Sequence, residues 1–277
     1  MITDHFNPGL LEGRTAFITG GGSGVNLAIG KAFAALGARI GICGRTRERL
    51  ESGRIALEAL GAEVFTAVAD VRDADAVQAA LDACRLALGP VDILVCGAAG
   101  NFVAPAEAIS AKGFRTVVEI DLLGTFHATR AAFPQLRETK GNILFVSGGQ
   151  SFVPFAFQAH VGAAKAGIDN LMRNLALEWG RYGIRCNSIV PGPVKDTEGM
   201  KRLGGPEDPD LWREMTPLGR MAEQEEIGQA AAFLVSPLAS YISGAGLRVD
   251  GGQNLTGSTL FNAAIARALA AGPGDPA

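Results

Sequence analysis

Short runs of apolar, β-branched residues alternate along the chain with longer stretches in which apolar positions recur every three or four residues. The short runs predict buried strands, and the helical spacing of the longer stretches predicts amphipathic helices. Strands are expected at Thr15–Thr19, Arg39–Cys43, Glu63–Val68, Ile93–Cys96, Asn142–Val146, Arg185–Val190 and Leu247–Asp250. Helices are expected at Asn26–Leu36, Arg47–Leu60, Ala74–Leu88, Ala111–Leu136, Gln158–Trp179 and Glu225–Leu234. This alternation predicts one α/β domain over residues 1–277, a Rossmann-type doubly wound sheet of seven parallel strands with helices on both faces.

Two segments depart from this alternation. Residues 192–219 are rich in Pro, Gly and charged residues and have no strand pattern, which is typical of a lid or substrate-binding loop. Residues 256–277 form a C-terminal tail, for which we expect a helix over Thr256–Ala271 and a frayed end.

Composition narrows the classes of function. A net charge of −3 over 277 residues argues against a general role in binding nucleic acid or a membrane surface. The chain shows neither a bilayer-length apolar run nor a signal-peptide pattern, and it does not end in a peroxisomal tripeptide, so we expect a cytoplasmic protein. The cysteines are far apart and lack a metal-binding pattern, so we expect no metal and four reduced core thiols, at Cys43, Cys84, Cys96 and Cys186.

A glycine-rich turn, Thr19-Gly-Gly-Gly-Ser-Gly-Val-Asn26, joins the first strand to the first helix. Small residues in this context let the backbone approach a pyrophosphate, whose charge suits the N-terminus of the helix. Asn26 stands where such a motif usually has its last glycine, and its bulk either loosens the packing or adds a hydrogen bond. The expected cofactor contacts in this turn are Gly20, Gly22, Ser23, Gly24 and Val25.

The end of the second strand distinguishes the two nicotinamide dinucleotides. An NAD site needs an acidic residue here for the ribose 2′-hydroxyl, whereas this chain has Arg45, which suits the 2′-phosphate of NADP(H). We therefore expect NADP(H), although Arg45 and Arg47 are also compatible with the start of a solvated helix. After the third strand, Asp70 and Val71 are expected at the adenine, with an ordinary turn Asp as the alternative.

Further short stretches complete a pattern with the glycine-rich turn, at Gly97–Asn101, Asp121–Phe126, Pro191–Pro193, Ser240–Gly244 and Val249–Gly252. Together they resemble the short-chain dehydrogenase/reductase family over nearly the whole chain. A closer likeness lies at Ala98–Phe102, Ala163–Gly167, Leu177–Gly180, Thr197–Gly199, Arg202–Gly205 and Ser236–Tyr241. Through these stretches the chain is most similar to the 2,4-dienoyl-CoA reductases of that family, especially the peroxisomal type. The resemblance implies further cofactor contacts at Ala98, Ala99, Gly100, Lys165, Pro191, Gly192 and Val194.

The resemblance also shows what is missing from this chain. Family members that reduce ketones have a proton-donating Tyr one helical turn before a Lys, but Val161 precedes Lys165 here. The catalytic Ser of the family falls near Gly148, beside Ser147, and is also absent. The dienoyl-CoA reductases similarly lack the Tyr, and they have Asp where other members have an active-site Asn, which is Asp121 here. Ordinary ketone reduction is therefore not expected.

Two residues are the candidates for catalysis. The resemblance implies that Lys165 holds the nicotinamide ribose and places positive charge near a developing oxyanion, with a snorkelling helix Lys as the alternative. Asp121 is expected to orient a proton-delivering water, with a structural helix Asp as the alternative. If the two pair, their attraction favours both charged forms while burial opposes them, and the sequence leaves the outcome open.

Several other residues are candidates for substrate contact. His160 lies about 140° around the helix from Lys165 and either touches substrate or packs as a polar core residue. Asn101 and Phe102 are expected to border the nicotinamide and acyl pocket, where Phe102 also fits a simple hydrophobic wall. Residues 152–157 either line an acyl tunnel or pack under the loop. Cations of the loop region that suit coenzyme A phosphates, or remain solvated, are Lys195, Lys201, Arg202, Arg213 and Arg220.

Three functions remain open at this stage. The first is NADPH-dependent reduction of 2,4-dienoyl-CoA to 3-enoyl-CoA, with an acyl-CoA as the small-molecule partner. The second is reduction of an enoyl or oxo-acyl thioester with a relocated acid, either His160 or Gln150. The third is a catalytically silent NADP-binding protein. The resemblance also implies a homotetramer formed through the helices at 111–136 and 158–179, although a monomer would have the same helix pattern.

Overall fold

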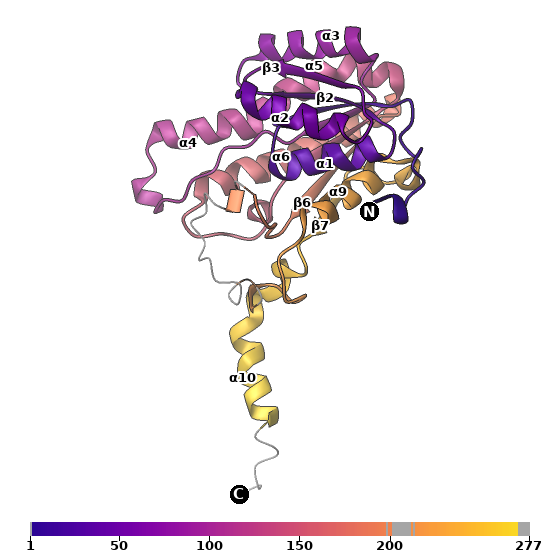
Figure 1. Cartoon of the computed structure of the whole chain (residues 1–277). Helices are drawn as coiled ribbons and strands as arrows, with labels where there is room; N and C mark the ends of the chain where they lie inside the picture. The colour runs from indigo at the N-terminus through magenta and orange to yellow at the C-terminus, as the bar shows by residue number, and fades with distance from the viewer. Residues whose placement is uncertain (1, 198, 201–211, 213, 271–277) are drawn as a thin grey trace, which may run out of the picture.

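Seven parallel strands form one sheet in the order β3-β2-β1-β4-β5-β6-β7 (Figure 1). The computed structural model describes residues 2–197, 199–200, 212 and 214–270. The strands are β1 (Thr15–Thr19), β2 (Arg39–Gly44), β3 (Val64–Val68), β4 (Ile93–Cys96), β5 (Asn142–Val146), β6 (Arg185–Pro191) and β7 (Gly246–Val249). The predicted doubly wound sheet is confirmed, and the strand ends differ from the predicted ones by no more than one residue.

Helices cover both faces of the sheet, and each face has its own hydrophobic core. One face carries α1 (Gly24–Ala35), α2 (Arg47–Glu58) and α9 (Gln224–Val235). The other carries α3 (Ala74–Leu88), α5 (Gly124–Thr139) and α6 (Ala159–Trp179). Because the strand order reverses between β1 and β4, a crevice opens at their carboxyl ends, where sheets of this kind bind ligands.

The helix predicted over Ala111–Leu136 is interrupted, which corrects the prediction. It consists of α4 (Ala111–Val118), a π-helical segment at Glu119–Leu123, and α5. A π turn holds more residues than an α turn and commonly marks a functional site. Asp121 is the middle residue of this segment and is fully buried.

The remaining elements are short turns and the C-terminal helix. Single 3-10 turns occur at η1 (Ile2–Asp4), η2 (Ala106–Ala108), η4 (Gly149–Ser151), η5 (Gly180–Tyr182) and η6 (Pro237–Ala239). The tail begins with a longer 3-10 segment, η7 (Gln253–Ser258), and continues as α10 (Thr259–Ala270). The α-helix thus begins three residues after the predicted start at Thr256. Figure 1 shows α10 projecting away from the body of the fold.

The two ends of the predicted loop 192–219 lie side by side. Val194 and Ala222 form a short parallel bridge, in which Lys195 N donates to Ala222 O at 3.0 Å and Ala222 N to Pro193 O at 2.9 Å. Residues 198, 201–211 and 213 of this loop lie outside the described residues. Within the part of the chain that is described, no helix is long and apolar enough to cross a membrane.

The four cysteines are buried and free. Burial raises the pKa of the Cys43, Cys84 and Cys186 thiols to about 12, and that of Cys96 further still. Since the thiolate is the reactive form, these side chains are inert core residues, as the sequence predicts.

Candidate active site

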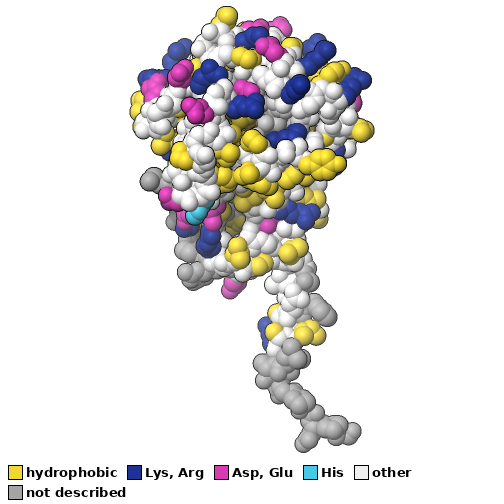
Figure 2. Space-filling view, turned by 90° about the vertical axis from the view of Figure 1, so that its right-hand side faces the viewer, with side chains coloured by type: hydrophobic (Ala, Val, Ile, Leu, Met, Phe, Trp, Pro, Cys, Tyr) yellow, Lys and Arg dark blue, Asp and Glu magenta, His cyan; other side chains and the backbone are white. Residues whose placement is uncertain are grey.

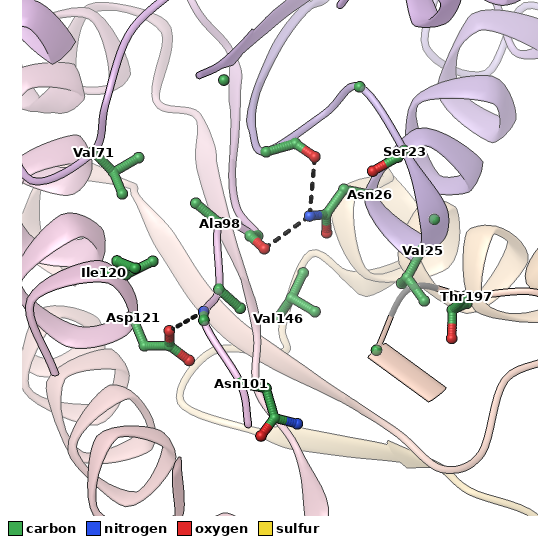
Figure 3. Close-up of a pocket in the computed structure, with 18 of the residues that line it drawn as sticks. Ser23, Val25, Asn26, Val71, Ala98, Asn101, Ile120, Asp121, Val146 and Thr197 are labelled. Carbon is green, nitrogen blue, oxygen red and sulfur yellow. Dashed lines mark hydrogen bonds between the residues drawn. The ribbon is translucent and has the colours of Figure 1, made fainter. Parts of the chain in front are cut away.

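A cavity of about 380 Å³ lies at the carboxyl ends of β1, β2, β4 and β5 (Figure 3). This volume falls within the usual range for small-molecule sites. The structure brings most of the predicted site residues together around it. Those that line the cavity are Gly20, Gly22, Ser23, Gly24, Val25, Arg45, Asp70, Val71, Ala98, Ala99, Gly100, Asn101, Asp121, Lys165 and Pro191.

The glycine-rich turn has the shape of a phosphate cradle. Gly20 has a φ of +68°, and a Cβ added there would lie 3.0 Å from Ala98 Cα, so a side chain would fill the cleft between the turn and β4. Gly24 begins α1 with a φ of +57°, which glycine adopts without strain. The amide groups at the start of α1 therefore face an open space that suits a pyrophosphate, and the residues present fit a dinucleotide.

Asn26 links this turn to the end of β4. Its Nδ2 donates to Gly97 O at 2.7 Å and to Gly20 O at 3.3 Å, as Figure 3 shows. Its Oδ1 is buried and has no hydrogen-bond partner among the described residues. Of the two effects that the sequence left open, the structure has the added hydrogen bonds.

Charged side chains border the part of the cavity formed by the segments after β2 and β3. Arg45 is exposed there, and its guanidinium has no hydrogen-bond partner within the described residues. Arg49 also lines the cavity, although the sequence analysis missed it. Helical spacing gave no signal for Arg49, because Arg45 precedes α2 and only Arg49 lies within the helix. Arg72 binds the Asp70 carboxylate at 2.5 Å, and this hydrogen bond lowers the pKa of Asp70.

Asp121 connects three parts of the site. Its Oδ1 accepts a hydrogen bond of 2.6 Å from the backbone N–H of Gly100, in the segment after β4 (Figure 3). Its Oδ2 lies 3.3 Å from Lys165 Nζ, and this ion pair is almost completely buried. Lys165 Nζ also donates to Val146 O at the end of β5, at 3.1 Å. The predicted pair is therefore present, and it joins the π segment, β5 and α6.

Burial has the largest effect on the pKa of Asp121 in this pair. It raises the pKa of Asp121 above the ordinary value, although the positive charge of Lys165 and the hydrogen bond from Gly100 both act to lower it. A buried carboxylate loses its hydration, and its two partners, the Gly100 N–H and the Lys165 ammonium, do not fully replace that hydration. Asp121 thus holds a proton more readily than an exposed Asp does.

His160 and Phe102 do not line the cavity. Their rings pack against each other with centroids 4.1 Å apart, and the His160 side chain is fully buried. Both ring nitrogens of His160 lack a hydrogen-bond partner among the described residues. Burial lowers the pKa of His160, while the nearby charge of Asp121 acts to raise it. The two residues therefore lie beside Asp121 but outside the lining of the cavity.

The position of the missing proton donor is apolar. Val161 is 3% exposed and packs with Val117, Ala164 and Phe102, so no side-chain hydroxyl is present one turn before Lys165. Gln150 lines the cavity next to Gly148, and its Nε2 donates to Gln158 Oε1 at 2.8 Å.

Other predicted contacts lie away from the cavity. Gly192 packs against Asp250, where a Cβ would come within 2.7 Å of the Asp250 Cα, and Val194 is buried in the core beside α9. Among the loop cations, Lys195 pairs with Glu223. Arg220 pairs with Glu226 at 2.7 Å, so acidic side chains already neutralise both cations. Lys201, Arg202 and Arg213 lie outside the described residues.

The apolar segment 152–157 stays near the surface. Phe152 and Phe157 are 41% and 55% exposed, and the Arg248 guanidinium lies 4.4 Å from the centre of the Phe152 ring. Within the described residues, no group of three or more His, Cys, Asp or Glu side chains is arranged to hold a metal ion.

Known proteins match the chain over most of its length. A family model described as enoyl-(acyl carrier protein) reductase matches residues 20–254. The peroxisomal 2,4-dienoyl-CoA reductase of Rattus norvegicus, named as (3E)-enoyl-CoA-producing, is 41% identical over 91% of this chain and 87% of its own. A probable 2,4-dienoyl-CoA reductase of Bacillus subtilis, named as (2E)-enoyl-CoA-producing, is 40% identical over 88% of this chain and 97% of its own.

Solved structures agree with this grouping. A short-chain dehydrogenase from Bacillus anthracis superposes with a TM-score of 0.79 at 38% identity, covering 88% of this chain and 97% of its own. A gluconate 5-dehydrogenase from Burkholderia cenocepacia, solved in complex with NADP and tartrate, superposes with a TM-score of 0.83 at 30% identity. The match covers 90% of this chain and 98% of the dehydrogenase.

Proposed function

The chain belongs to the short-chain dehydrogenase/reductase family, and from that premise we propose that it reduces 2,4-dienoyl-CoA thioesters to 3-enoyl-CoA with NADPH. One observation carries the proposal. The cavity contains the buried Asp121–Lys165 pair, while Val161 fills the place of the phenol that a ketone reductase needs. Curated relatives at about 40% identity carry the name 2,4-dienoyl-CoA reductase, which supports the same substrate class.

The reaction explains why a phenol is dispensable. When bound, a nicotinamide dinucleotide would supply a hydride, and the conjugated thioester would accept it at the δ-carbon. The electrons move through the diene to the thioester oxygen, and a proton then adds at the α-carbon to give the 3-enoyl product. The proton goes to carbon rather than to oxygen, so the site has to stabilise an oxyanion and deliver a proton from a different direction.

Asp121 and Lys165 fit these two tasks. The Lys165 ammonium supplies positive charge beside the oxyanion, and its bonds to Val146 O and Asp121 hold it in place. The raised pKa of Asp121 suits a group that passes a proton through a bound water to the α-carbon. Its bond to Gly100 N–H keeps the carboxyl oriented while it does so.

NADPH is the proposed reductant because of Arg45. The side chain stands at the cavity edge after β2, and the two residues before it, Cys43 and Gly44, provide no carboxylate for a ribose 2′-hydroxyl. A guanidinium binds a phosphate through charge-assisted hydrogen bonds. A homologous gluconate 5-dehydrogenase solved in complex with NADP supports this choice.

We also propose a homotetramer, on the basis of the family resemblance and of exposed apolar side chains on the surface. Apolar side chains are exposed on α4, the π segment, α5 and α6, at Phe114, Leu123, Phe126 and Leu177 respectively. Figure 2 shows hydrophobic side chains gathered in a band across one face of the molecule, above the C-terminal helix. A cytoplasmic location stays a prediction of the sequence.

The test is NADPH oxidation by the purified protein with a 2,4-dienoyl-CoA and, separately, with a 3-oxoacyl-CoA. We expect turnover of the dienoyl thioester only, and a 3-enoyl product whose double bond is located by NMR. Asp121→Ala is expected to abolish turnover while leaving NADPH binding intact. Turnover of the oxo substrate would instead indicate a relocated acid, and tight NADPH binding with no turnover of either would indicate a silent binding protein.

A further inference from the structure

The Gln150 side chain occupies the space that a side chain at position 148 would fill. Gly148 has an extended backbone with a φ of −164°, which any residue adopts. A Cβ added to Gly148 would lie 2.6 Å from Gln150 Oε1 and 3.9 Å from Lys165 Cγ. The carboxamide of Gln150 thus covers Gly148 beside the stem of Lys165, and all three residues line the cavity.

A second glutamine fixes this carboxamide. Gln150 lies in the 3-10 turn η4, and its Nε2 donates to Gln158 Oε1 at 2.8 Å. Gln158 is 7% exposed and immediately precedes α6, so it offers a rigid acceptor. An amide nitrogen carries two N–H groups. One of them is used in this bond, and the second has no partner among the described residues.

The Oε1 of this carboxamide faces Gly148 and its Nε2 faces Gln158, and the proposed reaction needs a hydrogen-bond donor in the cavity. Negative charge develops on the thioester oxygen, and oriented hydrogen-bond donors are the usual means of stabilising it. Lys165 Nζ already donates to Val146 O and pairs with Asp121. The two positions that would carry hydroxyl donors are Gly148 and Val161. An amide N–H stabilises the oxyanion by a hydrogen bond but does not give up its proton. The oxygen therefore stays unprotonated, and the proton is delivered to the α-carbon.

We propose that Gln150 is a catalytic residue that donates its second Nε2 N–H to the thioester oxygen, and that Gln158 positions it. This assignment rests on the proposed dienoyl-CoA reductase function. Gly148 is then required because a larger residue displaces the carboxamide. Gln150 adds no atoms to the reaction: it stabilises the charge that the hydride transfer places on oxygen and that is discharged when the α-carbon takes its proton.

Three variants test the assignment through kcat and KM. Gln150→Leu removes the donor at similar size, and loss of one oxyanion donor lowers kcat by about a hundredfold or more, with little change in KM because the bond strengthens as charge develops. Gly148→Ala is expected to fold normally, since the close contact of its Cβ is with the end of the Gln150 side chain, which can move aside by giving up its bond to Gln158, and to lower kcat similarly. The double variant is expected to be no slower than Gln150→Leu alone. Gln78→Leu, on the exposed face of α3, is the matched control and keeps wild-type kcat.

A spectroscopic measurement removes the dependence on turnover. The ultraviolet band of a conjugated dienoyl thioester moves to longer wavelength when its carbonyl accepts a hydrogen bond. Mixing the protein, NADP⁺ and a 2,4-dienoyl-CoA is expected to produce this shift in the wild type and a smaller one in Gln150→Leu and Gln158→Leu.

The outcomes separate this assignment from the proposed function. A wild type that shows both shift and turnover, with Gln150→Leu unchanged in both, overturns the role of Gln150 alone. A Gly148→Ala loss that multiplies with that of Gln150→Leu also overturns it, because the two changes then act independently. A wild type with neither shift nor turnover contradicts the proposed function and this assignment together.

Discussion

Replacing Asn26 with Ala tests how the cofactor turn is held to the sheet. The substitution removes both hydrogen bonds of Nδ2, to Gly97 O at 2.7 Å and to Gly20 O at 3.3 Å. These bonds connect the turn before α1 with the end of β4, which together form one wall of the cavity (Figure 3). We therefore expect the variant to lose stability and to bind NADPH more weakly.

The magnitude follows from opposing effects. Gly97 is buried, and leaving its carbonyl without a donor costs about 1–3 kcal/mol. Gly20 is only half-buried, and losing its longer bond costs about 0.5–1 kcal/mol because water replaces it. In the other direction, Ala removes the buried Oδ1 that has no hydrogen-bond partner, and this removal stabilises the protein by about 1 kcal/mol. Ala also favours the helix by about 0.5 kcal/mol. The cost of the two lost hydrogen bonds exceeds these gains, so the free energy of unfolding is expected to decrease by about 1–2 kcal/mol.

Urea unfolding followed by circular dichroism measures this decrease, and fluorescence titration measures the dissociation constant for NADPH. Asn26→Asp is the matched control, since it keeps the size of the side chain but turns a carboxylate oxygen toward two carbonyl oxygens. We expect it to be less stable than Asn26→Ala at neutral pH. An Ala variant as stable as the wild type, with unchanged NADPH affinity, would refute the reasoning and leave Asn26 as a packing residue.

Two further predictions concern the cofactor and the proton. Arg45→Ala is expected to raise the dissociation constant for NADPH about 10- to 100-fold, from the loss of charge-assisted hydrogen bonds, and to leave that for NADH unchanged; equal effects on both would remove the argument for NADP(H). Arg47→Ala, which does not line the cavity, is its control. Because burial raises the pKa of Asp121 and its protonated form supplies the proton, kcat/KM with a dienoyl-CoA is expected to be full below that raised pKa. The value of kcat/KM should fall as the pH rises through the raised pKa of Asp121. If the Asp121→Asn variant showed the same fall at high pH, the fall would belong to another group.

The sheet and the cofactor turn were predictable because their signals are local. Apolar strand runs and helical spacing specify each element within a few residues, and the glycine-rich turn needs only its neighbours to be recognised. Lys165 and Asp121 were found through the resemblance, which supplied a pattern spanning much of the chain. Their ion pair depends on where β5, α6 and the π segment meet, and no local pattern encodes that meeting point.

Other features could not be read from the sequence for physical reasons. The π turn at Glu119–Leu123 gives no change in apolar periodicity large enough to separate it from a continuous helix. Gln150 looked only like a substitute acid, because its bond to Gln158 spans eight residues with no regular secondary structure between them. For His160 the sequence left substrate contact and polar packing open, and the structure has the packing, with its ring against Phe102.

The π turn has a consequence for protein engineering. Deleting one residue from Glu119–Leu123 would allow α4 and α5 to merge into one regular α-helix, with stronger hydrogen bonds along its length. The same deletion would change the direction in which the remaining residues of that turn point, because successive residues of an α-helix are about 100° apart. Asp121 would then turn away from Gly100 and Lys165, and its carboxyl would lose both partners. A screen for thermal stability alone would therefore favour a shortened chain that has lost its proton source, so stabilising this scaffold requires leaving its least regular helical turn untouched.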